Sequence, residues 1–381
     1  MTEVAKPAEI LYRERDERIR KAIKLEPVDR VPVVFEGMAF APRYLGMSIA
    51  DFCADPEAPI YTALDTMDKI GGFDGINHAV SGKTTVLVSA AWLSHVNVPG
   101  RELPPDSLWQ IHEKEVMTID DYDFIINKGW GAFVESYLPR VVDVAEFKEA
   151  STWVKNNAAQ CIRQVRDRGY VPINASSTAP PYESFCGGRS MGKFLTDLYR
   201  IPDKVQAAMD VAIGEIMENA VKGAKAAGVP AVWIGGWRTA SSMVSPKIME
   251  RFVWPYVLKI VDALLSAGLT PVFHWDQDWT RDLIRLQALP PKSCILNPDG
   301  MTDMRQFKKI AGDRMAMMGD VPSTLFATGT PRDIDNYVHN LVDLFEARGL
   351  ILCPGCDAPI NTKPENMAAF VAASYKYGTT K

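Results

Sequence analysis

One histidine and two aspartates alternate in the segment His274-Trp-Asp276-Gln-Asp278. Side chains two positions apart on an extended segment point to the same side, so these three could share one face. Imidazole and carboxylate groups suit zinc, and a thiolate could complete the set. Cys356 is a candidate because it follows the last predicted strand. A histidine held by a neighbouring acid without any metal fits the same spacing, and both interpretations stay open.

Short apolar runs alternate with helical segments along most of the chain. Strands are predicted near 30–35, 73–76, 171–175, 231–235, 270–274, 294–297, 315–319 and 350–353. Strands that alternate with helices indicate a parallel sheet covered by helices. We therefore expect one α/β domain over residues 1–381, a (β/α)₈ TIM-type barrel. It would carry a helical N-terminal extension (1–30) and an inserted β-rich segment at about 84–126. An open doubly wound sheet is the alternative, but no Gly-x-Gly-x-x-Gly follows any strand.

The residues just past the carboxyl ends of parallel strands meet at one mouth of a barrel. Acids, histidines and cysteines gather at those positions here, so we expect the active site there. Catalytic candidates are Asp276, Asp278, Asp74 and Arg238. Candidates for contact with the substrate are Trp237, Trp275, Trp279, Tyr182, Arg189, Glu36 and His78. The tryptophans could wall a cavity for an aromatic substrate, and either arginine could clamp a carboxylate or be a solvated loop charge.

Composition narrows the class of protein. The chain has 42 Lys and Arg against 47 Asp and Glu, a net charge of −5, which gives no basic footprint for nucleic acid. No window reaches the roughly 18 apolar residues of a membrane span, and the charged start lacks a signal-peptide core. Six scattered cysteines do not resemble a disulfide framework. We expect a cytoplasmic enzyme for a small molecule, with a homodimer as one alternative for its quaternary structure.

Several segments together resemble the uroporphyrinogen-decarboxylase superfamily. They are residues 18–23 with 27–32, 245–256, the His274-x-Asp276 strand end, Asn297-Pro-Asp299 with 315–320, and 355–366. They follow one another in the expected order across nearly the whole chain. In true uroporphyrinogen decarboxylases the loop after the first strand is rich in arginine, whereas residues 35–44 here contain a single arginine, Arg43. The chain is therefore more similar to the corrinoid-dependent methyltransferases and demethylases of the superfamily.

That resemblance implies a ligand set. Methyltransferases of this branch bind zinc through a His-x-Cys pair and a distant cysteine, and the matching positions here are His274, Asp276 and Cys356. Asp276 thus stands where the pattern has cysteine. Demethylases of aryl methyl ethers use acids from the preceding strand and helix with the same histidine, and Arg238 and Val253 occupy that region.

The resemblance implies a methyltransferase of the O-demethylase type, with zinc as its metal cofactor. It would move a methyl group between a small substrate, such as an aryl methyl ether, and a corrinoid (cobalamin) on a separate protein. A partner is implied because the chain lacks an Asp-x-His-x-x-Gly stretch. One alternative is a metal-independent decarboxylase of a carboxylated aromatic or tetrapyrrole, with Arg238 or Arg189 as the clamp and Asp74 as the proton donor. Another is a non-catalytic barrel that binds a corrinoid or porphyrin protein.

Overall fold

Eight parallel strands form the centre of the computed structural model, which describes residues 6–379. Their order around the sheet is β1-β2-β5-β6-β7-β8-β9-β10. A parallel bridge between Val33 and Leu352 joins the first strand to the last, so the barrel closes. The predicted (β/α)₈ barrel is confirmed; residues 1–5 and 380–381 of the predicted domain lie outside the described part. The strands are β1 (Val34–Phe35), β2 (Gly75–His78), β5 (Val171–Thr178), β6 (Ala231–Gly236), β7 (Thr270–Trp275), β8 (Ile295–Pro298), β9 (Ala316–Val321) and β10 (Leu350–Pro354).

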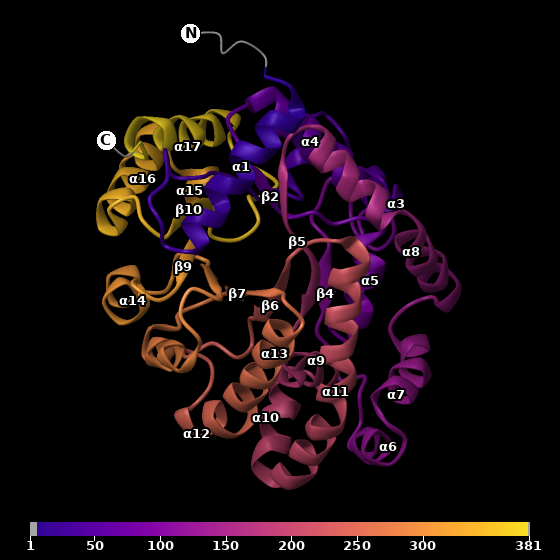
Figure 1. The fold of residues 1–381 in the computed structure, drawn as a ribbon. Helices are drawn as coiled ribbons and strands as arrows, with labels where there is room; N and C mark the ends of the chain where they lie inside the picture. The colour runs from indigo at the N-terminus through magenta and orange to yellow at the C-terminus, as the bar shows by residue number, and fades with distance from the viewer. Residues whose placement is uncertain (1–5, 380–381) are drawn as a thin grey trace.

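Helices surround the strands, as Figure 1 shows. The main helices between or after the barrel strands are α4 (Ala58–Ile70), α8 (Val144–Asp167), α11 (Pro202–Ala227), α13 (Trp254–Ser266), η3 (Thr280–Ala288), α14 (Met304–Ala311), α16 (Pro331–Phe345) and α17 (Pro364–Tyr377). A short helix, α12 (Pro246–Ile248), and a π-helical turn, η2 (Met249–Val253), lead into α13. Shorter helices lie in the connecting loops: α2 (Phe40–Tyr44), α3 (Ile49–Ala54), α6 (Asp120–Lys128), α7 (Trp130–Tyr137), η1 (Leu138–Arg140), α9 (Pro181–Arg189), α10 (Met191–Arg200) and α15 (Ser323–Thr328). Within residues 6–379 we find no helix with the length and apolar character of a membrane span.

Alternation along the strands sends every second side chain into the barrel. One apolar cluster fills the interior and contains Val34, Ala231, Val272, Ile295, Met318 and Ile351. Ile19 and Ala22 of α1 (Ala8–Ile23) belong to the same cluster, so α1 closes the amino-terminal end of the barrel. The intervening residues, such as Phe273, pack outward against the helices. The next inward position on each strand therefore lies at the carboxyl-terminal mouth.

The insertion at 84–126 contains less β-structure than the sequence predicted. Its antiparallel pair joins β3 (His95–Asn97) to β4 (Gln110–His112). Residues 84–88, predicted as a strand, form helix α5 (Thr84–Ala91), and residues 115–118 form no strand. The β-branched residues gave the wrong prediction because α5 packs against α8, and tertiary packing overrides this weak preference.

Asp74 lies at the amino-terminal end of the barrel, away from the predicted site. β2 begins directly after it, so its side chain is at the start of the strand. The buried carboxylate accepts bonds from Arg30 Nη1 and Nη2 at 2.7 and 2.8 Å and from Arg18 Nη1 at 2.7 Å. The backbone N–H of Val33 donates a further bond at 2.8 Å. Asp74 thus joins α1 and β1 to β2, and it is not among the residues that line the cavity at the barrel mouth.

Replacement of Asp74 by alanine would leave Arg30 without its buried counter-charge. We expect D74A to lower the free energy of unfolding by about 3–5 kcal/mol, measured by urea denaturation. Asp29→Asn removes only the exposed partner of Arg18 and should cost less than about 1 kcal/mol. Equal losses in the two variants would contradict the structural role of Asp74.

Asp320, at the other end of the barrel on β9, is a second buried carboxyl group. Only 1% of the residue is exposed, and burial raises its pKa to about 7. The Tyr337 hydroxyl donates a hydrogen bond to Oδ1 at 3.1 Å, which partly offsets that rise. Because the ordinary value is 3.8, the folded protein binds more protons than the unfolded chain between about pH 4 and pH 7. The stability contributed by the neutral carboxyl is therefore lost as the pH rises through this interval.

An asparagine at position 320 would remove this titration. We expect Asp320→Asn to be more stable than the native protein at pH 8 by roughly 1–4 kcal/mol, and the difference to shrink toward pH 4. Thermal unfolding between pH 4.5 and pH 8 measures it. Tyr337→Phe, which removes the bond that favours the carboxylate, should steepen the fall with pH. Parallel stability curves for all three proteins would show that Asp320 does not titrate in this range.

Candidate active site

The amide of Asn297 orients His274 at the barrel mouth. Asn297 Nδ2 donates to the Met318 carbonyl at 2.7 Å, so its Oδ1 must face the imidazole. His274 Nδ1 lies 2.8 Å from that oxygen and therefore carries the proton of this bond. The other ring nitrogen, Nε2, lies 3.3 Å from Asp276 Oδ1. The neighbouring strands β8 and β9 thus decide which nitrogen of His274 is offered to a ligand.

Further polar groups extend this network across the barrel. Asn77 Nδ2 donates to Glu36 Oε2 at 2.6 Å and to Asn297 Oδ1 at 3.2 Å. Asn174 Nδ2 donates to Asn77 Oδ1 at 2.7 Å. The Cys353 thiol lies 3.4 Å from Glu36 Oε2, and burial beside that carboxylate raises its pKa well above the usual range. Cys353 is therefore a buried thiol, and it belongs to the apolar cluster inside the barrel.

His274, Asp276 and Cys356 form a candidate metal centre. One potential ligand atom from each lies within 4.8 Å of the others. Zinc bonds of about 2.0–2.3 Å would require ligand atoms roughly 3.3–3.8 Å apart, so small side-chain adjustments would enclose an ion. Among residues 6–379, no other group of three or more His, Cys, Asp or Glu side chains has this spacing. All six cysteines are free thiols.

Charge and burial act against each other in this centre. Burial lowers the pKa of His274, but the charge of Asp276 and bonds with Asp276 and Cys356 raise it well above 6.5 overall. Burial raises the pKa of the Cys356 thiol, while His274 lowers it. Metal ligands must be deprotonated, so a bound cation would displace protons held by His274 and Cys356.

Two further titratable side chains, Asp357 and His78, belong to the same site. Asp357 accepts bonds from the backbone N–H groups of Met38 at 2.5 Å and Ala39 at 3.3 Å, so it fixes the loop after β1. Burial raises its pKa to about 7. His78 lies 3.9 Å from Glu36, but burial lowers the pKa of its imidazole below 6.5. His78 is therefore a neutral imidazole at neutral pH, able to donate or accept a hydrogen bond.

These groups open onto a cavity of about 580 Å³. Its acids, histidines and Cys356 gather at one end, while apolar and uncharged side chains form the remaining walls. Those walls come from the loop after β2, from α4, α5, α8, β4 and β5, and from three tryptophans. The principal wall residues are Pro59, Ala63, Ile76, Ala79, Val80, Leu87, Val88, Ala91, Trp92, Trp109, Ile111, Val154, Ala158, Ile162, Ala175 and Trp233.

Five of the residues predicted from the sequence meet at this cavity. They are Glu36, His78, His274, Asp276 and Cys356. They arrive from the ends of β1, β2, β7 and β10, as a barrel mouth requires. The remaining predicted residues do not line the cavity, and each has another role in the structure.

Trp275 and Trp279 lie behind the cavity wall. Their rings stack with centroids 4.1 Å apart and pack against Gly236. Trp279 Nε1 donates to the Asp276 carbonyl at 2.9 Å, so the pair supports the loop that carries Asp276. Trp275 points outward because it alternates with His274. Asp278 accepts a bond from the Thr280 N–H at 2.8 Å, at the first residue of η3.

The two arginines predicted as carboxylate clamps are buried in ion pairs. Arg189 Nε lies 2.7 Å from Asp197 Oδ2, and its Nη1 lies 2.7 Å from Glu115. Arg238 stacks 4.0 Å above the Trp237 ring and lies 3.9 Å from Glu183. Trp237 belongs to this cluster rather than to the cavity wall. Tyr182 is buried against Phe194, with ring centroids 4.8 Å apart.

Three tryptophans that the sequence did not single out line the cavity: Trp92, Trp109 and Trp233. Trp233 stacks on the His274 ring at 5.1 Å. Strand alternation could have identified it, because it lies two residues after the inward-facing Ala231. Trp92 and Trp109 belong to the insertion, and Trp109 lines the cavity together with Ile111, two residues further along the chain.

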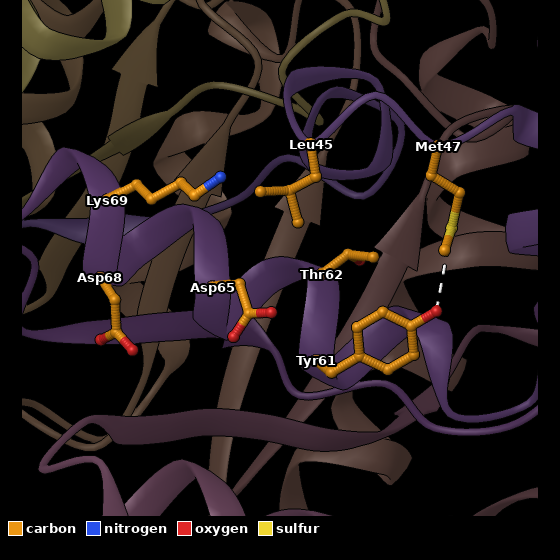
Figure 2. Close-up of a pocket in the computed structure, with 7 residues that line it drawn as sticks. All are labelled: Leu45, Met47, Tyr61, Thr62, Asp65, Asp68 and Lys69. Atoms are coloured by element: carbon orange, nitrogen blue, oxygen red, sulfur yellow. Dashed lines mark hydrogen bonds between the residues drawn. The ribbon is translucent and has the colours of Figure 1, made fainter.

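A separate surface pocket of about 510 Å³ lies beside α4 (Figure 2). The Tyr61 hydroxyl there lies 4.0 Å from the Met47 sulfur. Its two acids, Asp65 and Asp68, are paired with Arg168 at 2.6 and 2.9 Å. Because both of its acids are already paired with Arg168, we assign the candidate active site to the barrel mouth.

Comparison with known proteins agrees with this fold. A methyltransferase from Methanosarcina mazei matches with a TM-score of 0.71 at 16% identity, over 95% of this chain and 98% of that chain. A candidate vitamin-B12-independent methionine synthase from Listeria monocytogenes matches with a TM-score of 0.41 at 9% identity, over 91% and 96% of the chains. No curated protein matches the sequence. The family model for uroporphyrinogen decarboxylase (URO-D) matches residues 122–377, and the chain therefore belongs to the uroporphyrinogen decarboxylase family.

Proposed function

We propose that this protein is a zinc-dependent methyltransferase of the demethylase type. It would take a methyl group from a small methyl ether and deliver it to a corrinoid on a separate protein. The observation that carries the proposal is the cluster of His274, Asp276 and Cys356 at the end of a largely apolar cavity. Family membership supports an enzymatic function, and the fold match to a methyltransferase supports this branch of the family.

The residues present fit zinc. Imidazole nitrogen, carboxylate oxygen and thiolate sulfur are the three donor types that zinc accepts in proteins. Three protein ligands leave one position open, which is the arrangement of catalytic rather than structural zinc sites. Zinc bound here would supply Lewis-acid polarisation of the substrate oxygen.

The chain's own residues would prepare and shield this centre. Asn297 holds the proton of His274 on Nδ1, which leaves Nε2 as the donor atom. Trp279 fixes the backbone beside Asp276 through its indole N–H. The neutral imidazole of His78 can donate a hydrogen bond to the oxygen from which the methyl group leaves. The tryptophan and aliphatic walls exclude water from these groups.

Decarboxylation of a carboxylated substrate is less well supported by the geometry. It would need a clamp for the substrate's carboxylate and a proton donor at one place. Arg189 is buried in ion pairs, and Arg238 is buried beside Glu183 and against Trp92, so neither side chain lines the cavity. Asp74 lies at the opposite end of the barrel. The groups that would carry this reaction are therefore not brought together.

A joint measurement of metal content and methyl transfer tests the proposal. We expect about one zinc per chain, and formation of methylcobalamin from guaiacol (a simple methoxyphenol) and Co(I) cobalamin. His274→Ala should lose the zinc and at least about 100-fold of the rate. His339→Ala is the matched control, because that histidine lies on the surface beside Asp343.

Two results would overturn the proposal. One is retention of zinc and activity by the His274 variant, which would place the centre elsewhere. The other is a protein that stays inactive and zinc-free after incubation with zinc, while releasing CO₂ from a carboxylated aromatic.

The orientation of His274 by Asn297 generates a separate prediction. We expect Asn297→Ala to weaken zinc binding by about 10- to 100-fold, measured by competition with a chelator, because the ring loses the partner that fixes its tautomer. Asn174→Ala removes an amide two hydrogen bonds away and should change the affinity by less than about threefold. Unchanged affinity in a folded Asn297 variant would mean that Asp276 and Trp233 alone hold the ring.

A further inference from the structure

The cavity has two chemically different parts. Its polar end contains the candidate metal centre. Its other part, which we call the arm, lies between α4, α5 and α8 and is walled by Ala63, Leu87, Val88, Ala158 and Ile162. A substrate whose methyl group reaches His274 therefore has room to extend away from it.

The charges of the lining discriminate between substrates. Among the described residues, no lysine or arginine lines the cavity. Its acidic side chains, Glu36, Asp276 and Asp357, all lie in the polar end. A carboxylate in the arm would lose water and find no cationic side chain as a partner. The arm therefore disfavours a ligand whose carboxylate extends into it.

Size points the same way. Ligand pockets of about 300–1,000 Å³ usually enclose molecules well beyond a few heavy atoms, and this cavity of about 580 Å³ falls within that range. Methanol or a methylamine would leave most of the apolar wall uncovered. An aromatic ring with an apolar substituent would cover it, and aromatic walls such as Trp92 and Trp109 suit such a ring.

We propose that the methyl donor is an uncharged aromatic methyl ether whose apolar substituent extends from the metal centre into the arm, with Ala158 and Leu87 limiting its length. This inference rests on the proposed function for the identity of the reacting group. The preference for an uncharged, apolar body rests only on the cavity wall, so binding alone can test it.

A series of matched ligands measures the preference without any chemistry. The probes are guaiacol and its derivatives with a methyl, ethyl or propyl group para to the hydroxyl, together with vanillate, which carries a carboxylate there. We expect Kd from titration calorimetry to fall three- to fourfold for each added methylene, which corresponds to about 0.8 kcal/mol per buried CH₂. Vanillate should bind at least about tenfold more weakly than the methyl derivative.

A variant that fills the arm locates the effect. Ala158→Phe should weaken binding of the propyl derivative by at least about tenfold and leave guaiacol within about twofold. Ala159→Phe is the matched control, because the neighbouring residue on α8 is exposed and does not line the cavity. If Ala158→Phe fails to fold, the ligand series on the native protein still decides the question.

Two outcomes overturn the inference. The first is an affinity that does not change with the length of the substituent, and the second is vanillate binding as tightly as the methyl derivative. The proposed function fails separately, through the zinc and methyl-transfer measurements. A steep ligand series with no methyl transfer would preserve the substrate preference and reject the reaction, and a flat series with methyl transfer would do the reverse.

Discussion

The hydrogen bond between Asn297 and His274 is the interaction on which the barrel mouth depends. Closure of eight strands directs polar side chains from several of them into the buried interior of the barrel. Each such group must find a partner inside the barrel or destabilise it. The Asn297 amide joins β8 to three other strands, because it binds the Met318 carbonyl, the His274 ring and the Asn77 amide. Once these partners are satisfied, only the outer atoms of His274 and its neighbours remain to face the cavity.

The two ends of the barrel use similar acidic and basic groups for different purposes. At the amino-terminal end, Asp74 is surrounded by Arg30, Arg18 and a backbone N–H, so every oxygen is saturated. At the mouth, Asp276 pairs with the His274 ring, lies near Cys356 and remains partly exposed. A saturated carboxylate contributes to stability, whereas an incompletely bonded one beside a cavity can accept a ligand. The contrast explains why the same residue type was a poor guide to function before its position was known.

Strand periodicity predicted much of the fold and part of the site. Alternating apolar strands and helices gave the closed barrel, and positions just past the strands gave Glu36, His78, His274, Asp276 and Cys356. Asp74 was misplaced because β2 begins one residue after it. Trp275 was misplaced because it alternates with His274 and faces outward, and Trp279 because the loop after β7 stacks it on Trp275. The cavity wall from α5 was not predictable, since its packing against α8 leaves no local pattern, whereas Trp109 and Ile111 lie two residues apart and line the cavity together.

The aspartate at position 276 has a consequence for the kind of substrate atom the centre suits. A carboxylate and a thiolate carry the same formal charge, but the carboxylate is the harder ligand and releases less electron density. A centre with one histidine, one aspartate and one cysteine would therefore leave more positive charge on its ion than one with two cysteines. That favours a hard oxygen atom in the open position over a soft sulfur atom. The donor set and the apolar arm thus converge on an oxygen-linked methyl group attached to an uncharged aromatic body.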